Sequence, residues 1–264
     1  TISGLRRRGY TPSSIRKFSN SVGVTKRNSI IDVVRLENAL REELNKTSPR
    51  VFAVVDPIKV IITNYPEDKT EMIEAVNNPE NPDSGIRKIP FSKELFIERD
   101  DFMEDPPKKF FRLSVGKEVR LKYAYFIKCV DIVKNSKNEL TEIHCTYDPK
   151  SFGGKSSDGR KVKGTLHWVS AHNALDAKVK YYDRLFAKEN PEQETNFMDA
   201  LNPESSKTFP NAKIECGMET DNEQTYQFER LGYFKKDSKL EHKDKSVYIR
   251  VVSLRDSWAK ALKK

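Results

Sequence analysis

Short runs of β-branched and aromatic residues, separated by turn signals, fill the chain after residue 50 and constrain its fold more than any other feature. The first two runs, Val51–Val55 and Ile58–Thr63, are separated by the turn dipeptide Asp56-Pro57. Short strands at this spacing, mostly joined by tight turns, predict antiparallel barrels or sandwiches, and two such β units fit the length. Further strands are expected at Glu94–Glu98, Phe110–Val115, Val119–Val130, Leu140–Tyr147, Lys163–Val169, Ala177–Leu185, Thr225–Tyr233 and Ser246–Val252.

The first fifty residues have a helical pattern instead. Thr11-Pro12 offers an N-cap hydroxyl followed by proline at the first helical position, which predicts a helix that ends near Gly23. A second helix is expected to begin at Asn28 or Ser29, because apolar residues then recur mostly at steps of three and four. Ser48-Pro49 ends it, since the residue before a proline avoids the helical region. The fold class expected is therefore mainly β, after a short N-terminal helical segment.

The length and the cysteines limit the class of protein further. A chain of 264 residues exceeds one typical domain of roughly 100–200 residues, so two or three units are expected, with the irregular stretch Pro149–Arg160 near a seam. No stretch approaches the roughly 20 apolar residues that cross a bilayer. The widely spaced Cys129, Cys145 and Cys216 do not form a disulfide framework, so we expect a cytoplasmic location.

Basic residues exceed acidic residues and are concentrated in a few segments. Lysine and arginine number 48 against 39 aspartates and glutamates, which gives a net charge of +9. Such clusters suit a face that binds a polyanion, because neutralising phosphates releases condensed counterions. An ordinary solvated surface explains the composition equally well. The clusters are Arg6–Arg8, Lys26–Arg27, Lys108–Lys122, Lys155–Lys163 and Lys178–Lys180.

No catalytic or metal-binding motif meets its own geometric requirements. Gly154-Lys155-Ser156 imitates the end of a phosphate-binding loop, but Pro149 stands where that loop needs its first glycine. His167 and His172 are five residues apart, which does not suit a zinc site on a helix or in a knuckle. Nucleophile-elbow, Cys/His and Rossmann glycine signatures do not occur. We therefore expect neither catalytic residues nor metal ligands in this chain.

Three segments mix cations with aromatic residues: Lys108–Leu113, Arg120–Tyr123 and Tyr226–Arg230. Proteins bind single-stranded RNA by stacking its bases on aromatic or guanidinium planes and by hydrogen-bonding the base edges. Alternation in a strand more often places aromatics in the core, which we favour for Leu121, Tyr123 and Tyr125. The pattern alone leaves the question open for Arg112, Arg120 and Gln227.

Segments along nearly the whole chain resemble, in order, the region that follows the catalytic domain of glutaminyl-tRNA synthetases. The match is poor near Pro79 and between Glu189 and Glu219, apart from one short motif, and we assign no role there. The matching segments are Thr1–Thr11, Gly23–Lys26, Pro49-Arg50, Val54–Pro57, Gly116–Leu121, Asp158–Gly164, His167–Ala171, Tyr182–Phe186, Asn202–Ser205 and Gln227–Phe234.

The resemblance implies three parts. Residues 1–49 would be a helical connecting segment that contacts the inner corner of the L-shaped tRNA. Residues 50–160 and 161–264 would be two antiparallel β-barrels that bind the anticodon, with the chain free to cross between them. The partners implied are tRNA-Gln and the catalytic domain of the same polypeptide, with no membrane and a monomeric state.

The resemblance also implies what this chain lacks. The family signatures for adenylate formation, of the His-Ile-Gly-His and Met-Ser-Lys types, do not occur. The full-length parent would be a glutamine–tRNA ligase that uses ATP and Mg²⁺. This fragment would bind no cofactor of its own and would be inactive.

Roles at the second and third anticodon bases can be transferred residue by residue. Arg50 and Gln227 match family residues that hold the middle base, with Arg230 close by. Arg112 matches a residue that reads the third base. The chemistry is suitable, because uracil and guanine edges offer carbonyl acceptors to an arginine fork or an amide.

Two further groups match the first anticodon base and the tRNA corner. Arg120 and Lys122 match positions at the first base, where C and U are both accepted. Lys122 stands where arginine is frequent, so bidentate binding is lost there. Thr25, Lys26 and Arg27 match the loop that touches the inner corner of the tRNA.

Three alternative interpretations stay open from the sequence. The eukaryotic-type glutamyl-tRNA synthetases share paired barrels and read a related anticodon, although Gly116–Leu121 and Gln227–Phe234 favour the glutaminyl type. A stand-alone RNA-binding barrel protein would bind without anticodon preference. An independent enzyme would need a catalytic site that the sequence does not contain.

Overall fold

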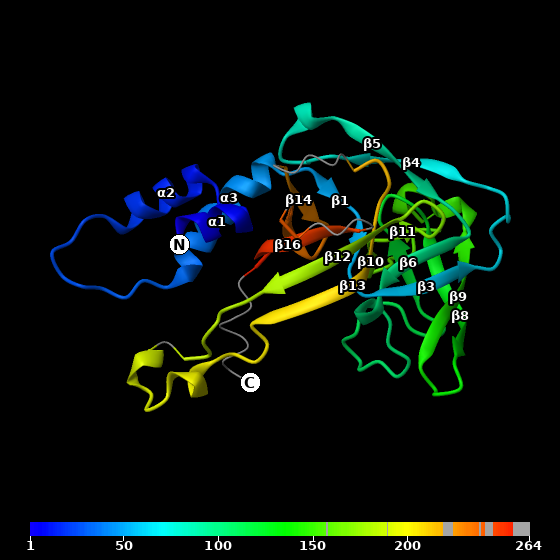
Figure 1. The fold of residues 1–264 in the computed structure, drawn as a ribbon. Helices are drawn as coiled ribbons and strands as arrows, with labels where there is room; N and C mark the ends of the chain where they lie inside the picture. The colour runs from blue at the N-terminus through cyan, green and yellow to red at the C-terminus, as the bar shows by residue number, and fades with distance from the viewer. Residues whose placement is uncertain (157, 189, 219–223, 238, 241–244, 256–264) are drawn as a thin grey trace. The chain divides into compact units, whose positions relative to one another are not determined.

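The structure is a computed structural model that describes residues 1–156, 158–188, 190–218, 224–237, 239–240 and 245–255. Figure 1 shows a short helical part at the N-terminus followed by strands, and the sheets are barrel-like. The expected fold class, mainly β after a helical segment, is confirmed. None of the described helices is long and apolar enough to cross a membrane.

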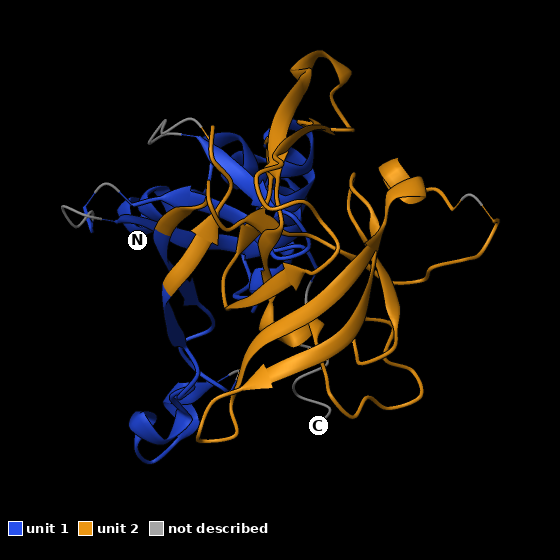
Figure 2. Cartoon of the chain, turned by 90° about the vertical axis from the view of Figure 1, so that its right-hand side faces the viewer, with its two compact units in different colours: residues 1–48, 177–210, 220–264 blue, residues 49–176, 211–219 orange. Residues whose placement is uncertain are grey.

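The chain forms two compact units, and neither is continuous in sequence (Figure 2). Unit 1 consists of residues 1–48, 177–210 and 220–264, and unit 2 of residues 49–176 and 211–219. The chain therefore leaves unit 1 after the helices, returns to it within a strand, and visits unit 2 again briefly. The expected division into a helical segment of residues 1–49 and barrel regions of residues 50–160 and 161–264 stays a prediction.

Three helices open unit 1: α1 (Ile2–Arg8), α2 (Pro12–Val22) and α3 (Val33–Thr47). Helix α2 has the predicted limits, because the Thr11 hydroxyl accepts the Ser14 N–H at 3.1 Å and Gly23 forms the C-cap. The predicted start of α3 at Asn28 or Ser29 was wrong. Asp32 is the N-cap, and its carboxylate accepts the Val34 N–H at 3.0 Å. A carboxylate bonded to a first-turn N–H fixes the helix start more strongly than periodicity does.

The helices pack on the sheet of unit 1 through one stripe of α3. Leu40 and Leu44 are buried because they recur at a four-residue step and so share one face of the helix. Thr11 and Ser13 at the start of α2 both donate to the Glu43 carboxylate of α3, at 2.9 and 2.7 Å. The buried cluster consists of Tyr10, Leu40, Leu44, Tyr233, Val251 and Val252.

The sheet of unit 1 has the order β14-β15-β16-β12-β13. Strand β12 pairs with β16 in parallel, while β14, β15 and β16 pair antiparallel. The single strand predicted at Thr225–Tyr233 is wrong, because the chain reverses at Arg230, which has a left-handed φ of 68°. The strands are β12 (Leu175–Tyr182), β13 (Ser206–Ile214), β14 (Thr225–Phe228), β15 (Gly232–Lys236) and β16 (Ser246–Ser253).

The main sheet of unit 2 has the order β10-β7-β8-β9-β3-β6-β11. Its strands are β3 (Pro57–Ile62), β6 (Glu94–Glu98), β7 (Glu118–Leu121), β8 (Phe126–Lys134), β9 (Leu140–Asp148), β10 (Thr165–Leu166) and β11 (Val169–Ser170). The unit also contains β1 (Arg50–Val51), β2 (Ala53–Val54), and a hairpin of β4 (Glu71–Val76) and β5 (Ile86–Phe91). This hairpin was not predicted, because its strands flank an acidic, Pro/Asn-rich stretch of sequence.

Three predicted strands of unit 2 were wrong. Lys163–Val169 is split into β10 and β11, which pair with β7 and β6 respectively. Val119–Val130 is a β7–β8 hairpin, whose turn contains Tyr123 with a φ of 66°. The alternation continues across this turn because Leu121 and Tyr125 both point into the core. Phe110–Val115 is irregular, with only isolated bridges at Leu113 and Val115.

Aromatic contacts fill the core of unit 2. Trp168 is fully buried and meets Phe91 edge-on at 5.0 Å and Phe52 at 5.7 Å between ring centres. Its Nε1 donates to the Lys122 carbonyl at 3.0 Å, so the polar atom of this ring is satisfied. This bond also fixes the β7–β8 turn to the core.

A buried carboxylate ties the returning segment of the chain into unit 2. Glu215 accepts the Phe52 N–H at 2.8 Å and two nitrogens of Arg87 at 2.5 and 3.0 Å. The Glu215 side chain is only 2% exposed, so its charge depends on Arg87 for compensation. The pair thus connects β5, the start of the unit and the end of β13.

We predict that Arg87→Ala lowers the free energy of unfolding by about 3 kcal/mol, because it removes a bidentate cation from the buried Glu215 carboxylate. Urea unfolding followed by tryptophan fluorescence measures the change. The control is Lys88→Ala, an exposed neighbour in β5. Equal stability of the two variants would contradict a structural role for the pair.

Candidate RNA-binding surface

The structure distributes the predicted RNA-binding residues over both units. Unit 2 contains Arg50, Arg112, Arg120 and Lys122, whereas unit 1 contains Gln227, Arg230, Thr25, Lys26 and Arg27. Each group is therefore described within its own unit.

A basic pocket of about 320 Å³ surrounds Arg112 in unit 2. The guanidinium is anchored at its base, because Nε lies 3.4 Å from the buried Asp101 carboxylate and Nη1 donates to the Asp100 carbonyl at 2.9 Å. Four cations face a single carboxylate, so an anionic ligand is favoured. The lining residues are Pro106, Pro107, Lys108, Phe110, Phe111, Arg112, Lys117, Glu118, Lys163 and Gly164.

Phe111 gives this pocket an exposed aromatic plane. Its side chain is 55% exposed, and the Lys163 Nζ lies 5.0 Å from the centre of its ring. A planar base can stack on such a ring while the cation meets a phosphate or a carbonyl. Phe111 and Lys163 were not predicted as site residues, although both lie in basic segments that are evident from the sequence.

Arg120 lies in β7, and Lys122 follows this strand in the β7–β8 turn. The Arg120 guanidinium carbon is 5.5 Å from the centre of the Phe126 ring, and the Lys122 Nζ is 5.2 Å from that of Tyr123. The main chain of Lys122 is fixed, since its N–H donates to the Leu166 carbonyl at 2.9 Å. Both cations are half-buried and are backed by aromatic rings.

Gln227 and Arg230 frame the β14–β15 turn of unit 1. Gln227 is only 6% exposed, and among the described residues its Oε1 has no hydrogen-bond donor. Buried polar atoms in folded proteins nearly always have a partner, so this acceptor is suited to a donor from a ligand. Arg230 is exposed at the left-handed turn position. Arg50, at the start of β1 in unit 2, is half-buried, and its N–H donates to the Asn77 carbonyl at 2.6 Å.

Thr25, Lys26 and Arg27 lie in the exposed loop between α2 and α3. The Thr25 hydroxyl accepts the Arg27 N–H at 3.2 Å, which shapes the loop locally. At the end of the loop, the Asp32 carboxylate lies 3.4 Å from the Arg184 guanidinium. The three predicted residues are thus presented to solvent from a loop anchored in unit 1.

His167 and Glu98 make structural contacts inside unit 2. His167 is fully buried, and its Nε2 lies 3.5 Å from the Glu98 carboxylate. That carboxylate also accepts the Val55 and Asp56 N–H groups, at 2.7 and 3.1 Å. In the part of the chain that the structure describes, no three His, Cys, Asp or Glu side chains gather as a metal site.

Comparison with known proteins gives a consistent family. Two family models, both described as the anticodon-binding domain of class I tRNA synthetases (E and Q), match residues 48–148 and 165–237. The chain is 50% identical to a glutamine–tRNA ligase of Bradyrhizobium diazoefficiens over 265 residues, which cover all of this chain and 47% of that protein. A glutamine–tRNA ligase of Rhodopirellula baltica is 50% identical over 264 residues, 98% of the chain and 44% of the relative. The chain thus spans about half the length of these relatives.

We predict that the double variant Lys108→Gln/Lys163→Gln reduces the salt dependence of binding to a single-stranded RNA oligonucleotide. Two lost phosphate contacts would make the slope of log K against log salt shallower by about 1.4. Fluorescence anisotropy at several KCl concentrations measures the slope. Lys88→Gln, which removes a charge outside the pocket, is the control, and an equal slope for all three proteins would contradict RNA binding here.

Proposed function

We propose, since this chain belongs to the anticodon-binding domains of the class I glutamyl- and glutaminyl-tRNA synthetases, that it binds tRNA-Gln and reads its anticodon. The observation that carries the proposal is the sequence identity of 50% with glutamine–tRNA ligases, which extends over essentially the whole chain. The basic pocket with an exposed phenylalanine and the orphan amide oxygen of Gln227 support it independently.

The middle anticodon base is assigned to Arg50 and Gln227, with Arg230 close by. Uracil presents two carbonyl acceptors and one N–H donor. A guanidinium donates to the carbonyls, while the buried Oε1 of Gln227 would accept the N–H. An unpaired buried acceptor gives strong discrimination, because a base without that donor leaves it unsatisfied.

The outer two bases are assigned to unit 2. Arg112 would read the third base at the edge of the basic pocket, where Phe111 offers a stacking plane. Arg120 and Lys122 would meet the first base, and a lysine there suits a position that accepts both C and U, because it donates as a point charge rather than as a fork. A good bidentate contact discriminates by about 1–3 kcal/mol, so three bases could supply most of the choice between tRNAs.

The exposed loop of unit 1 would contact the inner corner of the same tRNA. Thr25, Lys26 and Arg27 offer a hydroxyl and two cations to the phosphate backbone, which positions the tRNA without reading sequence.

The parent polypeptide is proposed to be a cytoplasmic, monomeric glutamine–tRNA ligase whose catalytic domain uses ATP and Mg²⁺. This chain contributes binding and no chemical step. Its differential affinity for the cognate anticodon could also favour the productive state of the distant active site.

The decisive experiment titrates this chain with tRNA-Gln and with the same tRNA altered only at the middle base, at fixed moderate salt. The wild-type chain should prefer the unaltered tRNA, and Gln227→Ala should lose about 1–3 kcal/mol of that preference. Gln193→Ala, an exposed glutamine in the 3-10 helix η4 (Pro191–Gln193), is the control. Equal binding to both tRNAs would reduce the function to general RNA binding.

For the tRNA corner, we predict that Lys26→Ala weakens binding by a similar factor for cognate and altered tRNA, and that it makes the salt slope shallower by about 0.7–0.9. Titrations at several KCl concentrations give both quantities. An unchanged slope would contradict a phosphate contact at Lys26.

A further inference from the structure

Arg120 is a cation that has no ionic partner among the described residues, although carboxylates lie nearby. In the described part of the chain its side chain has no ion pair or hydrogen bond, and its Nε is buried without a partner. Glu118 lies two residues earlier on the same face of β7, where an ion pair with Arg120 would be expected. Another cation must therefore bind the Glu118 carboxylate in place of Arg120.

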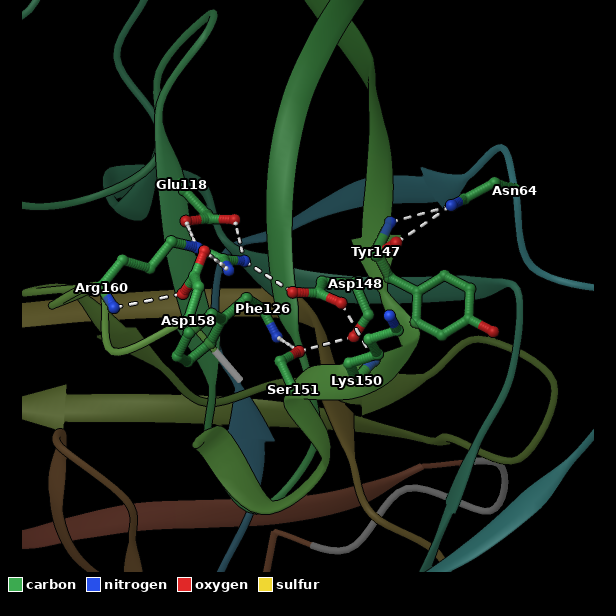
Figure 3. A network of polar contacts seen from close by, with 9 residues as sticks. All are labelled: Asn64, Glu118, Phe126, Tyr147, Asp148, Lys150, Ser151, Asp158 and Arg160. Atoms are coloured by element: carbon green, nitrogen blue, oxygen red, sulfur yellow. Dashed lines mark hydrogen bonds and ion pairs between the residues drawn. The ribbon is translucent and has the colours of Figure 1, made fainter. Parts of the chain in front are cut away.

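The competing cation is Arg160 (Figure 3). Its Nε and Nη2 donate to both oxygens of Glu118, each at 2.9 Å. Its Nη2 also lies 2.6 Å from the Asp148 carboxylate, and its Nη1 lies 2.8 Å from that of Asp158. One guanidinium thus occupies three carboxylates.

These contacts stabilise the charged forms of the partners. Hydrogen bonding to Glu118, then to Asp148 and Asp158, raises the pKa of Arg160. The Arg160 side chain in turn lowers the pKa of Asp148, and the pKa of Asp158 is lowered first by the Arg160 backbone N–H. Asp148 and Asp158 therefore stay ionised, and without Arg160 the three carboxylates would lose their common cation and attract the nearest remaining one.

Both arginines rest on the same aromatic ring. The guanidinium carbons of Arg120 and Arg160 are 5.5 and 5.3 Å from the centre of the buried Phe126 ring. Phe126 is fixed, because its N–H donates to the Ser151 hydroxyl at 2.8 Å and that hydroxyl donates to the Asp148 carbonyl at 2.6 Å. Arg160 and Arg120 thus contact the same fixed ring, but among the described residues only Arg160 is paired with carboxylates.

A glycine shapes the other side of the Arg120 chain. Gly154 ends the 3-10 segment η3 (Pro149–Gly154), and its N–H donates to the Ala124 carbonyl at 3.1 Å. A Cβ at Gly154 would lie 2.6 Å from the Arg120 Cδ and 2.9 Å from its Nε. Only glycine leaves the Arg120 side chain its observed path.

We propose that Arg160 and Gly154 are positioning residues for Arg120: Arg160 occupies the neighbouring carboxylates, and Gly154 leaves room for the extended side chain, so that Arg120 meets the first anticodon base uncommitted. This inference rests on the proposed function. It makes Arg160, which has no direct role in reading RNA, a determinant of RNA affinity.

The test is a rescue experiment on the whole chain with tRNA-Gln. Arg120→Ala should weaken binding about 5- to 150-fold, the range of one good base contact. Arg160→Ala should weaken it comparably, because Glu118 is then released to pair with Arg120. Arg160→Ala/Glu118→Gln should regain part of the affinity, because the released carboxylate on the same face of β7 as Arg120 is then removed.

The glycine supplies a matched second arm. Gly154→Ala should weaken binding in the wild-type background but add no loss in the Arg120→Ala background. Gly153→Ala is the control, since its φ of 71° imposes the same backbone strain as the 75° of Gly154, while a Cβ there meets no atom within 4 Å. Equal losses for the two glycine variants would overturn the positioning role of Gly154.

The possible results distinguish a failure of the proposed role of Arg120 from a failure of its positioning by Arg160. Wild-type affinity for Arg120→Ala would overturn the proposed role of Arg120 and the inference with it. A weakened Arg120→Ala together with an unrescued Arg160→Ala/Glu118→Gln would overturn the positioning by Arg160 alone. Urea unfolding of each variant establishes that the protein titrated is folded.

Discussion

The buried carboxylate of Glu215 connects the beginning of unit 2 with the segment that returns to it at the end of β13. It receives the Phe52 N–H and the Arg87 guanidinium, and the neighbouring residues of β13 pair with β2. The chain reaches this point only after a long excursion into unit 1, so the charge fixes a contact between segments far apart in sequence. The β2 segment that it holds leads directly into the strands of the sheet that presents Arg120 and Lys122.

The same electrostatic requirement distinguishes Arg87 and Arg160 of unit 2 from Arg120. Arg87 and Arg160 are committed to carboxylates, and they hold segments together. Arg120 has no such commitment among the described residues, although its surroundings would provide one. A net charge of +9 says little about where RNA binds, whereas the contacts of each arginine show how it is held: Arg112, assigned to the third base, is itself anchored at the Asp101 carboxylate.

Local chemistry predicted the fold well where the chain makes its own turns. Helix α2, with its Thr11 cap and Gly23 end, and strand β6 came directly from sequence. The hairpins at Tyr123 and Arg230 could not, because a left-handed turn residue that is not glycine or asparagine gives no signal and is imposed by tertiary contacts. Site residues were transferred from a family resemblance. The pocket beside Arg112 and the Arg160 network needed three dimensions, since their members come from separate segments.

Those two turns differ from the Asn138 turn between β8 and β9, where an asparagine tolerates its φ of 63° readily. Tyr123 and Arg230 adopt similar angles at a cost of about 1 kcal/mol each. Each follows closely on a residue assigned to the anticodon, Lys122 or Gln227. A glycine at either position would relieve the backbone and remove the side chain. We therefore expect natural sequences to keep a side chain at these two positions for RNA recognition, although glycine there would stabilise the fold. A consensus sequence designed for thermal stability would lose RNA-binding side chains at these positions first.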